Sequence, residues 1–476
     1  MTLLALLAVP LAAVAALARA RGPAAAAAHG AGAGLTLAAA IGLGLAVARE
    51  GSVTALGGLL RADALSAWMA ALVALVAALA AAEAPRHVPL GEGGRFYPLL
   101  HLFTFTMLLA VTTDDVGLMW VAVEGTTLAS VFLVNFERSR ASLEASYKYL
   151  LICSVGVAIA FVGTVLVYFA DVQAFGHEPH ALRWTTLVRL APGLPSRVVE
   201  LAFVFLVIGY GTKAGLAPMH TWLPDAHSEA PAPVSALMSG VLLSVGLYAV
   251  LRFKTVADLA AGGAFAQRLL VVLGLVSLAV AAAFLWAPRN YKRMLAYSSI
   301  EHVGIACLGV AFGGPWGLGG ALLHVANHAL AKSVLFLLSG RIRAAYRSAE
   351  IPAVGGLLAA MPRTGPAFFV AMLALMGLPP FGLFVSEVMI FRAGFEAGWP
   401  GATAAALVLL VIAFAGLLRA VHRMAYGTAP TPPAEPDGWL STAPVAVALG
   451  LLVLTGLAWP PGLATALGRM AAALAP

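Results

Sequence analysis

Four ionisable residues lie inside long apolar runs of this sequence. Glu124 lies in GLMWVAVEGTTLASVFLV, Lys213 in VFLVIGYGTKAGLAPMH, Lys332 in LLHVANHALAKSVLFLL and Glu387 in GLFVSEVMIF. An ionisable group inside a membrane is costly and by default marks a functional site. Each one alone could be a buried ion pair that fixes helix packing. Four together favour a row of groups that take up and release protons.

Histidines accompany one of these lysines at a regular interval. His324, His328 and Lys332 are four residues apart, which places all three on one face of a helix. Histidine titrates near neutral pH, so this row is suited to passing protons. Two histidines at this interval also form half of a zinc site, but no HExxH glutamate lies between them and no third ligand is evident. The pattern therefore favours a proton relay over a metal site.

A polar segment, HTWLPDAHSEAPAPVSALMSG, follows the run that contains Lys213. We assign its His220 to the proton pathway. The rest of the segment fits either a loop buried by partner proteins or an element that couples proton movement to them. Further coupling candidates are Asp225, His227 and Glu229 in this segment, Glu144 and Lys148 in RASLEASYKYL, and Glu301 and His302 in SSIEHVG. Glu144 and Lys148 could equally be an ordinary helix pair.

Membrane-spanning helices must position these residues. The chain has 476 residues, of which 61% are hydrophobic and 10% charged, and its mean hydropathy is +0.94. Soluble domains average about 25% charged residues, so the composition excludes an ordinary globular enzyme. Fourteen apolar runs of about 20 residues can be counted, centred near residues 10, 40, 73, 105, 125, 158, 207, 242, 276, 304, 330, 380, 411 and 450. The first of these resembles a signal peptide but lacks a basic start, which favours a retained span.

Two of the spans contain helix-breaking residues next to an ionisable one. Glycines and Pro218 surround Lys213 in the seventh span, and the GLPPFG sequence precedes Glu387 in the twelfth. Interrupted helices at matching places in two halves indicate a transport site. The spacing predicts an all-α polytopic membrane protein with two inverted five-helix repeats. We expect three helices in residues 1–95, the repeats in 96–255 and 264–425, and a last helix with a tail in 436–476.

Basic residues indicate the orientation of the chain. Loops after odd-numbered spans carry 16 of the 28 lysines and arginines, and loops after even-numbered spans carry 9. The excess places the odd loops in the cytoplasm and both termini on the outer face of the cytoplasmic (inner) membrane. Because the basic residues lie between spans rather than on one face, nucleic-acid binding is not expected.

Several kinds of chemistry are not expected in this chain. Cys153 and Cys307 both lie in apolar runs and form no CxxC motif. The sequence also lacks a phosphate-binding loop of the G-x-x-x-x-G-K-[ST] type. We therefore expect no cofactor and no metal in the chain itself.

The polar segments resemble a known family. HTWLPDAHSEAPAPVSALMSG, KRMLAYSSIEHVG, HVANHALAKSVLFLLSG and GLPPFGLFVSE are similar to motifs of the antiporter-like subunits of respiratory complex I, over roughly residues 100–395. The segment from MWVAVEGTT to LLICSVG resembles the component F subunit of hydrogenase-4. This resemblance implies a central hydrated axis, with Glu124, Lys213 and Lys332 as its proton carriers and Glu387 near the exit. Many relatives have a further lysine in the eighth helix, where this chain has Ser244, so the link from Lys213 to Lys332 would rely on water, His220, His324 or His328.

We therefore expect a proton-translocating subunit of a redox-driven complex. The expected partners are other membrane subunits and a peripheral arm with iron–sulfur, or also nickel–iron, subunits. The alternatives are a multisubunit cation/proton antiporter driven by ion gradients, the membrane partner of an inorganic-carbon uptake complex, and a non-conducting scaffold.

Overall fold

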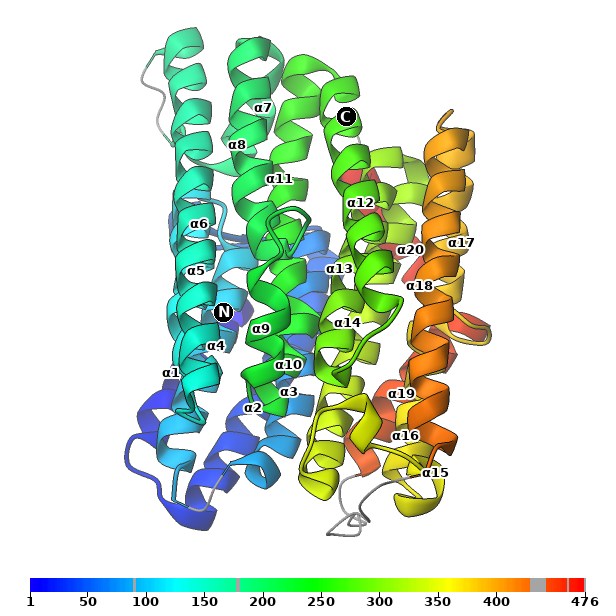
Figure 1. Ribbon diagram of the computed structural model, residues 1–476. Coiled ribbons are helices and arrows are strands. Elements are labelled where there is room, and N and C mark those ends of the chain that lie inside the picture. Colours follow the sequence, from blue (N-terminus) through cyan, green and yellow to red (C-terminus); the bar gives the residue numbers. More distant parts are fainter. Residues whose placement is uncertain (89–90, 177–179, 429–441, 460–461, 475–476) are drawn as a thin grey trace.

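The computed structural model describes residues 1–88, 91–176, 180–428, 442–459 and 462–474. The chain forms a bundle of long helices that stand side by side (Figure 1). Among the described residues, ten helices are long and apolar enough to cross a membrane, and four shorter helices are also apolar. All fourteen expected span centres fall within helices or, near residue 380, between the two parts of a broken one. The prediction of an all-α polytopic membrane protein is confirmed.

The bounds of the elements in the first half of the chain are as follows. They are α1 (Thr2–Leu17), α2 (Gly22–Glu50), β1 (Val53–Ala55), β2 (Leu60–Ala62), α3 (Ala64–His87), α4 (Gly93–Thr112), α5 (Val116–Val134), α6 (Arg140–Phe175), α7 (Trp184–Leu190), α8 (Ser196–Ala214), α9 (Trp222–Glu229), α10 (Ala232–Leu237), the π-helical turn Met238–Leu242 and α11 (Leu243–Ala261). Short 3₁₀ turns cover Leu56–Gly58 and Ala191–Gly193.

The elements of the second half follow the same helical pattern. They are α12 (Gly263–Leu285), α13 (Tyr291–Phe312), α14 (Gly314–Tyr346), the 3₁₀ turn Ile351–Ala353, α15 (Leu357–Ala360), α16 (Thr364–Leu375), α17 (Gly382–Glu396), α18 (Pro400–Tyr426), α19 (Thr442–Leu457) and α20 (Leu463–Leu474). The centre of the bundle is formed by α13, α14 and the segment Ala232–Ala261, whose most apolar windows are 94% to 100% buried.

Side-chain caps fix where several of these helices begin. Asp63 accepts a hydrogen bond from the backbone nitrogen of Ser66 at the start of α3, and Asp115 caps α5 in the same way. Ser139 caps α6, and Asn290 caps α13. Such caps satisfy amide groups that have no partner inside the helix. Two of these capped helices carry ionisable residues singled out in the sequence: α5 carries Glu124, and α13 carries Glu301 and His302.

The seventh and twelfth spans are broken where the glycines and prolines predict. The helix α8 ends at Ala214, and Gly215 turns the chain with a φ of +78°, a conformation that glycine tolerates best. In the twelfth span, Gly377 has a φ of +67°, and a Cβ there would collide with the carboxylate of Glu387. Both breaks therefore bring an ionisable side chain next to irregular backbone inside the bundle.

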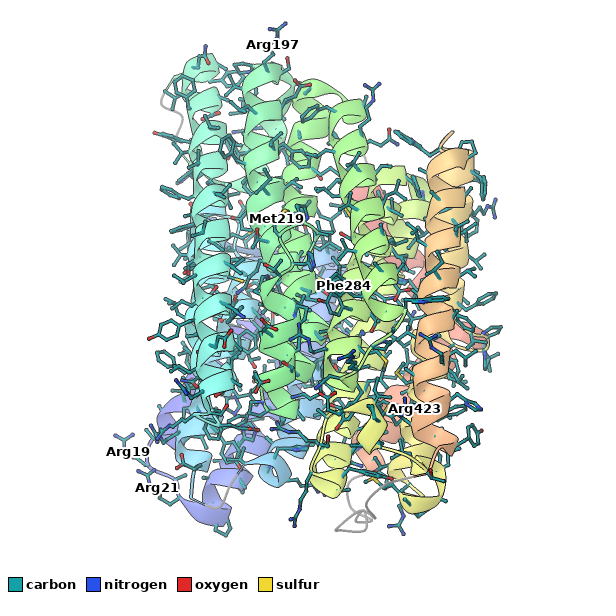
Figure 2. The ribbon with its side chains drawn as sticks, in the orientation of Figure 1. Arg19, Arg21, Arg197, Met219, Phe284 and Arg423 are labelled. Atoms are coloured by element: carbon teal, nitrogen blue, oxygen red, sulfur yellow. The ribbon has the colours of Figure 1, made fainter. Side chains whose placement is uncertain are left out.

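Basic residues from two odd-numbered loops lie at one end of the bundle. Figure 2 shows Arg19, Arg21 and Arg423 at the lower end and Arg197 at the upper end. The first three follow the first and thirteenth spans, and Arg197 follows the sixth. This alternation agrees with the loop count, while the side of the membrane that each end faces stays a prediction.

Two features were not expected from the sequence. A two-stranded hairpin pairs Val53 with Ala62 between α2 and α3. The predicted C-terminal tail contains a further helix, α20, after α19. Residues 436–441 of the predicted C-terminal unit lie outside the described residues.

Candidate proton pathway

Lys213 is enclosed by three helices in the first half of the molecule. Its Nζ donates hydrogen bonds to the hydroxyls of Thr127 on α5, at 2.8 Å, and Tyr149 on α6, at 2.9 Å. The Tyr149 hydroxyl is in turn 2.7 Å from that of Ser130. Hydroxyl groups can both donate and accept. They can therefore stabilise the nitrogen whether or not it carries its third proton.

Glu124 lies one turn before Thr127 on α5 and is half-buried. One carboxylate oxygen accepts a hydrogen bond from Ser154 at 2.6 Å, and the other lies 3.5 Å from the Thr127 hydroxyl. The structure places Thr127 between Glu124 and Lys213, and within the described ranges no ion pair joins the two charges. The sequence could not show this bridge because it depends on how α5, α6 and α8 meet.

Lys332 occupies the centre of the second half and is fully buried. Its Nζ donates to the carbonyl of Leu295, at 2.7 Å, and to the hydroxyl of Ser298, both on α13. The two histidines that precede Lys332 also face α13. The rings of His324 and His328 lie 5.1 and 5.2 Å from the ring of His302. These contacts agree with the predicted single face of α14.

A cluster of buried acid and imidazole groups continues from Lys332 towards α17. His302 Nδ1 lies 3.1 Å from His324 Nε2, and His324 Nδ1 lies 3.0 Å from the hydroxyl of Ser386, next to Glu387. Among the described residues, hydrogen-bond partners are lacking for Glu301 Oε2, His302 Nε2, His328 Nε2 and Glu387 Oε1. A buried polar atom without a partner costs about 1–3 kcal/mol. The cluster is therefore suited to water molecules and mobile protons.

The same cluster brings together three side chains of metal-ligating types, although the sequence showed no third such group beside His324 and His328. One ligand atom each from His302, His324 and Glu387 lie within 4.8 Å of one another. Two imidazoles and a carboxylate suit a divalent transition metal. No third ligand was evident in the sequence because these groups come from three different helices. The structure also places Glu301 and His302, which we listed as coupling candidates, in the interior beside Lys332.

His227 on α9 lies on the other side of Lys332. It is fully buried, and its ring stacks on Phe336, one turn after Lys332 on α14, with 4.9 Å between the ring centres. Neither ring nitrogen has a hydrogen-bond partner in the part of the chain that the structure describes. His324 and His328, which we had considered as links from Lys213 to Lys332, face His302 on α13. His227 follows the break after Lys213 and interacts electrostatically with both Lys332 and His328, and His220 lies in that break just before α9.

Comparisons with known proteins show the family to which the chain belongs. A family model described as NADH:quinone oxidoreductase/Mrp antiporter, transmembrane, matches residues 113–413, which include every group from Glu124 to Glu387. The chain belongs to this family. It is 40% identical to the hydrogenase-4 component F homolog of Methylacidiphilum infernorum over 334 residues, which are 70% of each protein. The predicted resemblance to antiporter-like subunits and to component F is confirmed.

Solved structures show the same fold. A chain of respiratory complex I from Thermus thermophilus superimposes with a TM-score of 0.85 at 25% identity, covering 100% of both chains. A chain of the Mrp complex from Dietzia sp. gives a TM-score of 0.87 at 22% identity, covering 99% of this chain and 97% of that one. These relatives are subunits of multi-subunit membrane complexes.

Several charges of this antiporter-like subunit form a network at its surface. Lys148 on α6 pairs with Glu144 at 2.6 Å and with Asp225 on α9 at 3.1 Å. Arg293 on α13 pairs with the same aspartate. Glu229 accepts a hydrogen bond from the hydroxyl of Ser228. The predicted helix pair is thus present, and it also ties α6 to the two elements that flank the buried axis.

Other buried charges escaped the sequence analysis. Lys292 is 1% exposed and donates to the carbonyls of Ser228 and Ala230, both at 2.8 Å. Glu83 on α3 pairs with Arg341 on α14 at 2.7 Å. Both lie near the ends of helices, where charges look like loop residues in a sequence. The burial of Lys292 adds a cation close to α9.

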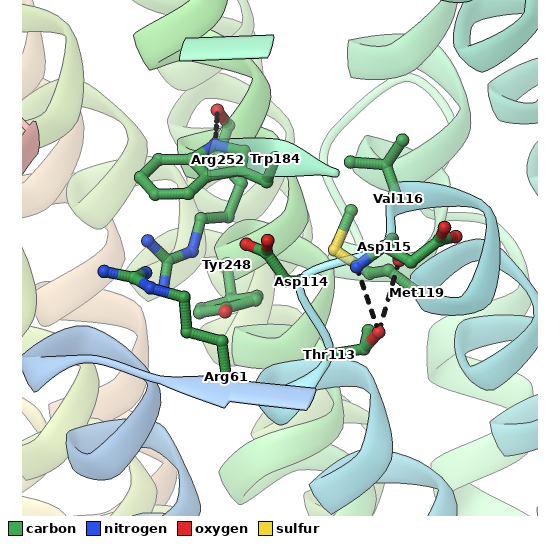
Figure 3. Close-up of a pocket in the computed structure, with 9 residues that line it drawn as sticks. All are labelled: Arg61, Thr113, Asp114, Asp115, Val116, Met119, Trp184, Tyr248 and Arg252. Carbon is green, nitrogen blue, oxygen red and sulfur yellow. Dashed lines mark hydrogen bonds between the residues drawn. The ribbon is translucent and has the colours of Figure 1, made fainter. Parts of the chain in front are cut away.

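A further buried ion pair lies beside the two-stranded hairpin, directly after β2. Arg252 on α11 forms a two-pronged ion pair with Asp63, at 2.7 and 2.8 Å, and its guanidinium lies over the rings of Trp184 and Tyr248. Figure 3 shows Arg252, Trp184 and Tyr248 among the side chains that line a cavity of about 10 Å³, together with Arg61 and Asp114. Burial favours the protonated acid, but the guanidinium of Arg252 outweighs it and holds the pKa of Asp63 below its usual range.

Proposed function

We propose that this chain is a proton-translocating membrane subunit of a multi-subunit, redox-driven complex of the hydrogenase-4 and complex I type. The observation that carries the proposal is the set of ionisable groups inside the bundle, which lie at both broken spans and on the helices between them. The proposed pathway begins at Glu124 and Lys213, passes His227 and Lys332, and ends at Glu387. Family membership and the relatives' names support the same reading.

The geometry supports a stepwise transfer of protons. Lys213 releases a proton when its interaction with Glu124, through Thr127, weakens. Water and the free nitrogens of His227 carry the proton to Lys332. From there it passes through Glu301 and the histidines of α13 and α14 to Glu387, which exchanges it with the solution. Each step returns the donor to a neutral amine or imidazole or to a carboxylate, so the cycle can repeat.

The driving force would come from partner proteins. Electron transfer in an iron–sulfur, or also nickel–iron, arm would alter the charge near one end of the axis. The surface network around Lys148 and Asp225 is placed to transmit such a change to α9. We infer two inverted repeats in residues 96–255 and 264–425, a location in the cytoplasmic membrane, and both termini on its outer face.

The test is redox-driven proton movement without alkali cations. The complex is purified from gently solubilised membranes and reconstituted in liposomes in choline buffer. Reduced methyl viologen then serves as electron donor, with protons or a soluble quinone as acceptor. We expect a pH gradient that an uncoupler abolishes. Proton flux that needs Na⁺ or K⁺ and no electron donor would instead support a cation/proton antiporter, and absence of any flux would support a scaffold.

Thr127→Val is expected to lower the number of protons moved per electron by about tenfold. The substitution keeps the shape of the side chain but removes the hydroxyl between Glu124 and Lys213. A hydrogen bond to a charged group contributes about 1.5–3 kcal/mol, and 1.4 kcal/mol corresponds to tenfold in rate. Thr126→Val is the matched control, because the Thr126 hydroxyl bonds the carbonyl of Val123 in its own helix. Equal pumping by the two variants would contradict the bridging role.

A further inference from the structure

A large apolar groove lies at the side of the bundle, away from the proton pathway. It measures about 760 Å³. Residues of α2, α3 and α20 line it. Most of the lining residues are small: Gly44 and Ala48 on α2, Gly51 just after it, Ala64, Ala67 and Ala71 on α3, and Ala466 and Ala473 on α20. These helices therefore leave a space that their own side chains do not fill.

Two arginines line this groove from different elements. Arg61 belongs to β2, and Arg469 belongs to α20. Arg61 gives one of its nitrogens to Asp63 at 3.0 Å, and that carboxylate is already held by Arg252. Within the described ranges, no acidic side chain pairs with Arg469. The groove therefore has apolar walls and a surplus of positive charge.

The surroundings of the groove indicate a lipid environment. Ile41 and Leu45, on the same helix as Ala48, are 53% and 57% exposed. An apolar surface of this kind on a membrane-spanning helix faces hydrocarbon rather than water. Trp68 and Trp184 also line the groove, and tryptophan is enriched at the level of lipid headgroups. Lipid chains can therefore reach the groove from the side.

The size of the groove distinguishes between a lipid and a helix of a neighbouring subunit. A membrane-spanning helix about 10 Å wide and 30 Å long occupies roughly 2,400 Å³. The groove offers about a third of that volume. It cannot enclose a whole helix, whereas a single hydrocarbon chain fits inside it.

We propose that this groove binds one phospholipid with a net negative headgroup. An acyl chain lies along the small residues of α2 and α3, and the guanidinium groups of Arg469 and Arg61 contact the phosphate. Arginine matches phosphate oxygens through paired hydrogen bonds. A zwitterionic headgroup would offset part of this attraction with its own cation.

The proposal is tested with the purified full chain in mild detergent. After delipidation, binding of phosphatidylglycerol is compared with that of phosphatidylcholine of the same acyl chains and with glycerol phosphate, by native mass spectrometry. We expect phosphatidylglycerol to bind best and glycerol phosphate not to bind. Arg469→Gln should weaken binding about fivefold, since a basic residue near a membrane surface contributes roughly 1 kcal/mol. Ala48→Phe should block the groove.

Two control variants are matched to Arg469→Gln and Ala48→Phe. Arg423→Gln removes an exposed arginine elsewhere, and Ile41→Phe adds bulk on α2 outside the groove. Both should bind lipid as the unaltered chain does. Equal binding of the two phospholipids, or equal retention by Ala48→Phe and Ile41→Phe, would overturn the proposal. Cross-linking of a partner subunit to a cysteine at position 48 in native membranes would also overturn it. None of these readouts depends on proton transport.

Discussion

Lys332→Met is expected to stop proton movement through the assembled complex, lowering the protons moved per electron by at least about tenfold. Methionine keeps the length of the side chain but cannot hold a proton. His328 lies one turn before Lys332 on α14, and Phe336, on which the ring of His227 stacks, lies one turn after it. Without the amine of Lys332, the proposed pathway loses the proton carrier between these two histidines.

The control for this experiment is Lys254→Met. Lys254 pairs with Asp258 near the end of α11 and takes no part in the pathway. Both variants are compared after the content of the complex and the rate of electron transfer have been measured, which separates loss of pumping from loss of assembly. If Lys332→Met pumps as well as Lys254→Met, Lys332 is a structural residue and the pathway is wrong.

The sequence predicted the positions of the helices, the two helix breaks and the ionisable residues inside the apolar spans. Apolar runs of membrane length located the helices, and glycine and proline located both breaks. A charge in an apolar run stands out because burying it is costly, which is how Lys213 and Lys332 were found. The interval of four between His324 and His328 showed that they share a helix face.

The contacts of these residues were not accessible to the same reasoning. His302, His324 and Glu387 come from three helices, so no local pattern predicts that they converge. Thr127 looks like any helix threonine until α8 brings Lys213 to its hydroxyl. His227 lies in a segment that reads as a loop, and its burial becomes visible only when α9 packs against α14. Tertiary packing, rather than local sequence, decides which of several polar residues joins the pathway.

Ion pairs between distant segments were the hardest to predict. Asp63 and Arg252 are 189 residues apart: Asp63 caps the start of α3, whereas Arg252 lies in the middle of α11. No local pattern joins two such positions, so the pair could not be predicted from the sequence. The structure buries both, with Arg252 5% and Asp63 9% exposed.

Arg252→Met is accordingly expected to destabilise the chain by about 3–5 kcal/mol, the cost of leaving one member of a buried ion pair without its partner. Asp63 would remain as a buried carboxylate and would still cap α3 through Ser66. The measurement is thermal unfolding of the purified chain in detergent. Because the pKa of Asp63 is lowered in the folded state, the stabilisation is present at neutral pH and is lost as the pH falls through that value.

Two further variants show whether the loss comes from the unpaired charge. In the double variant Arg252→Met with Asp63→Asn, the side chain at position 63 is neutral and can still cap α3, so part of the stability should return. Arg392→Met breaks the exposed pair with Glu396, both about half exposed, and should cost less than about 1 kcal/mol. If Arg252→Met lowers the stability no more than Arg392→Met does, the Asp63–Arg252 pair does not stabilise the fold around the hairpin. A large loss that the double variant partly reverses would show that charge pairing, rather than packing around Trp184 and Tyr248, closes this end of the bundle.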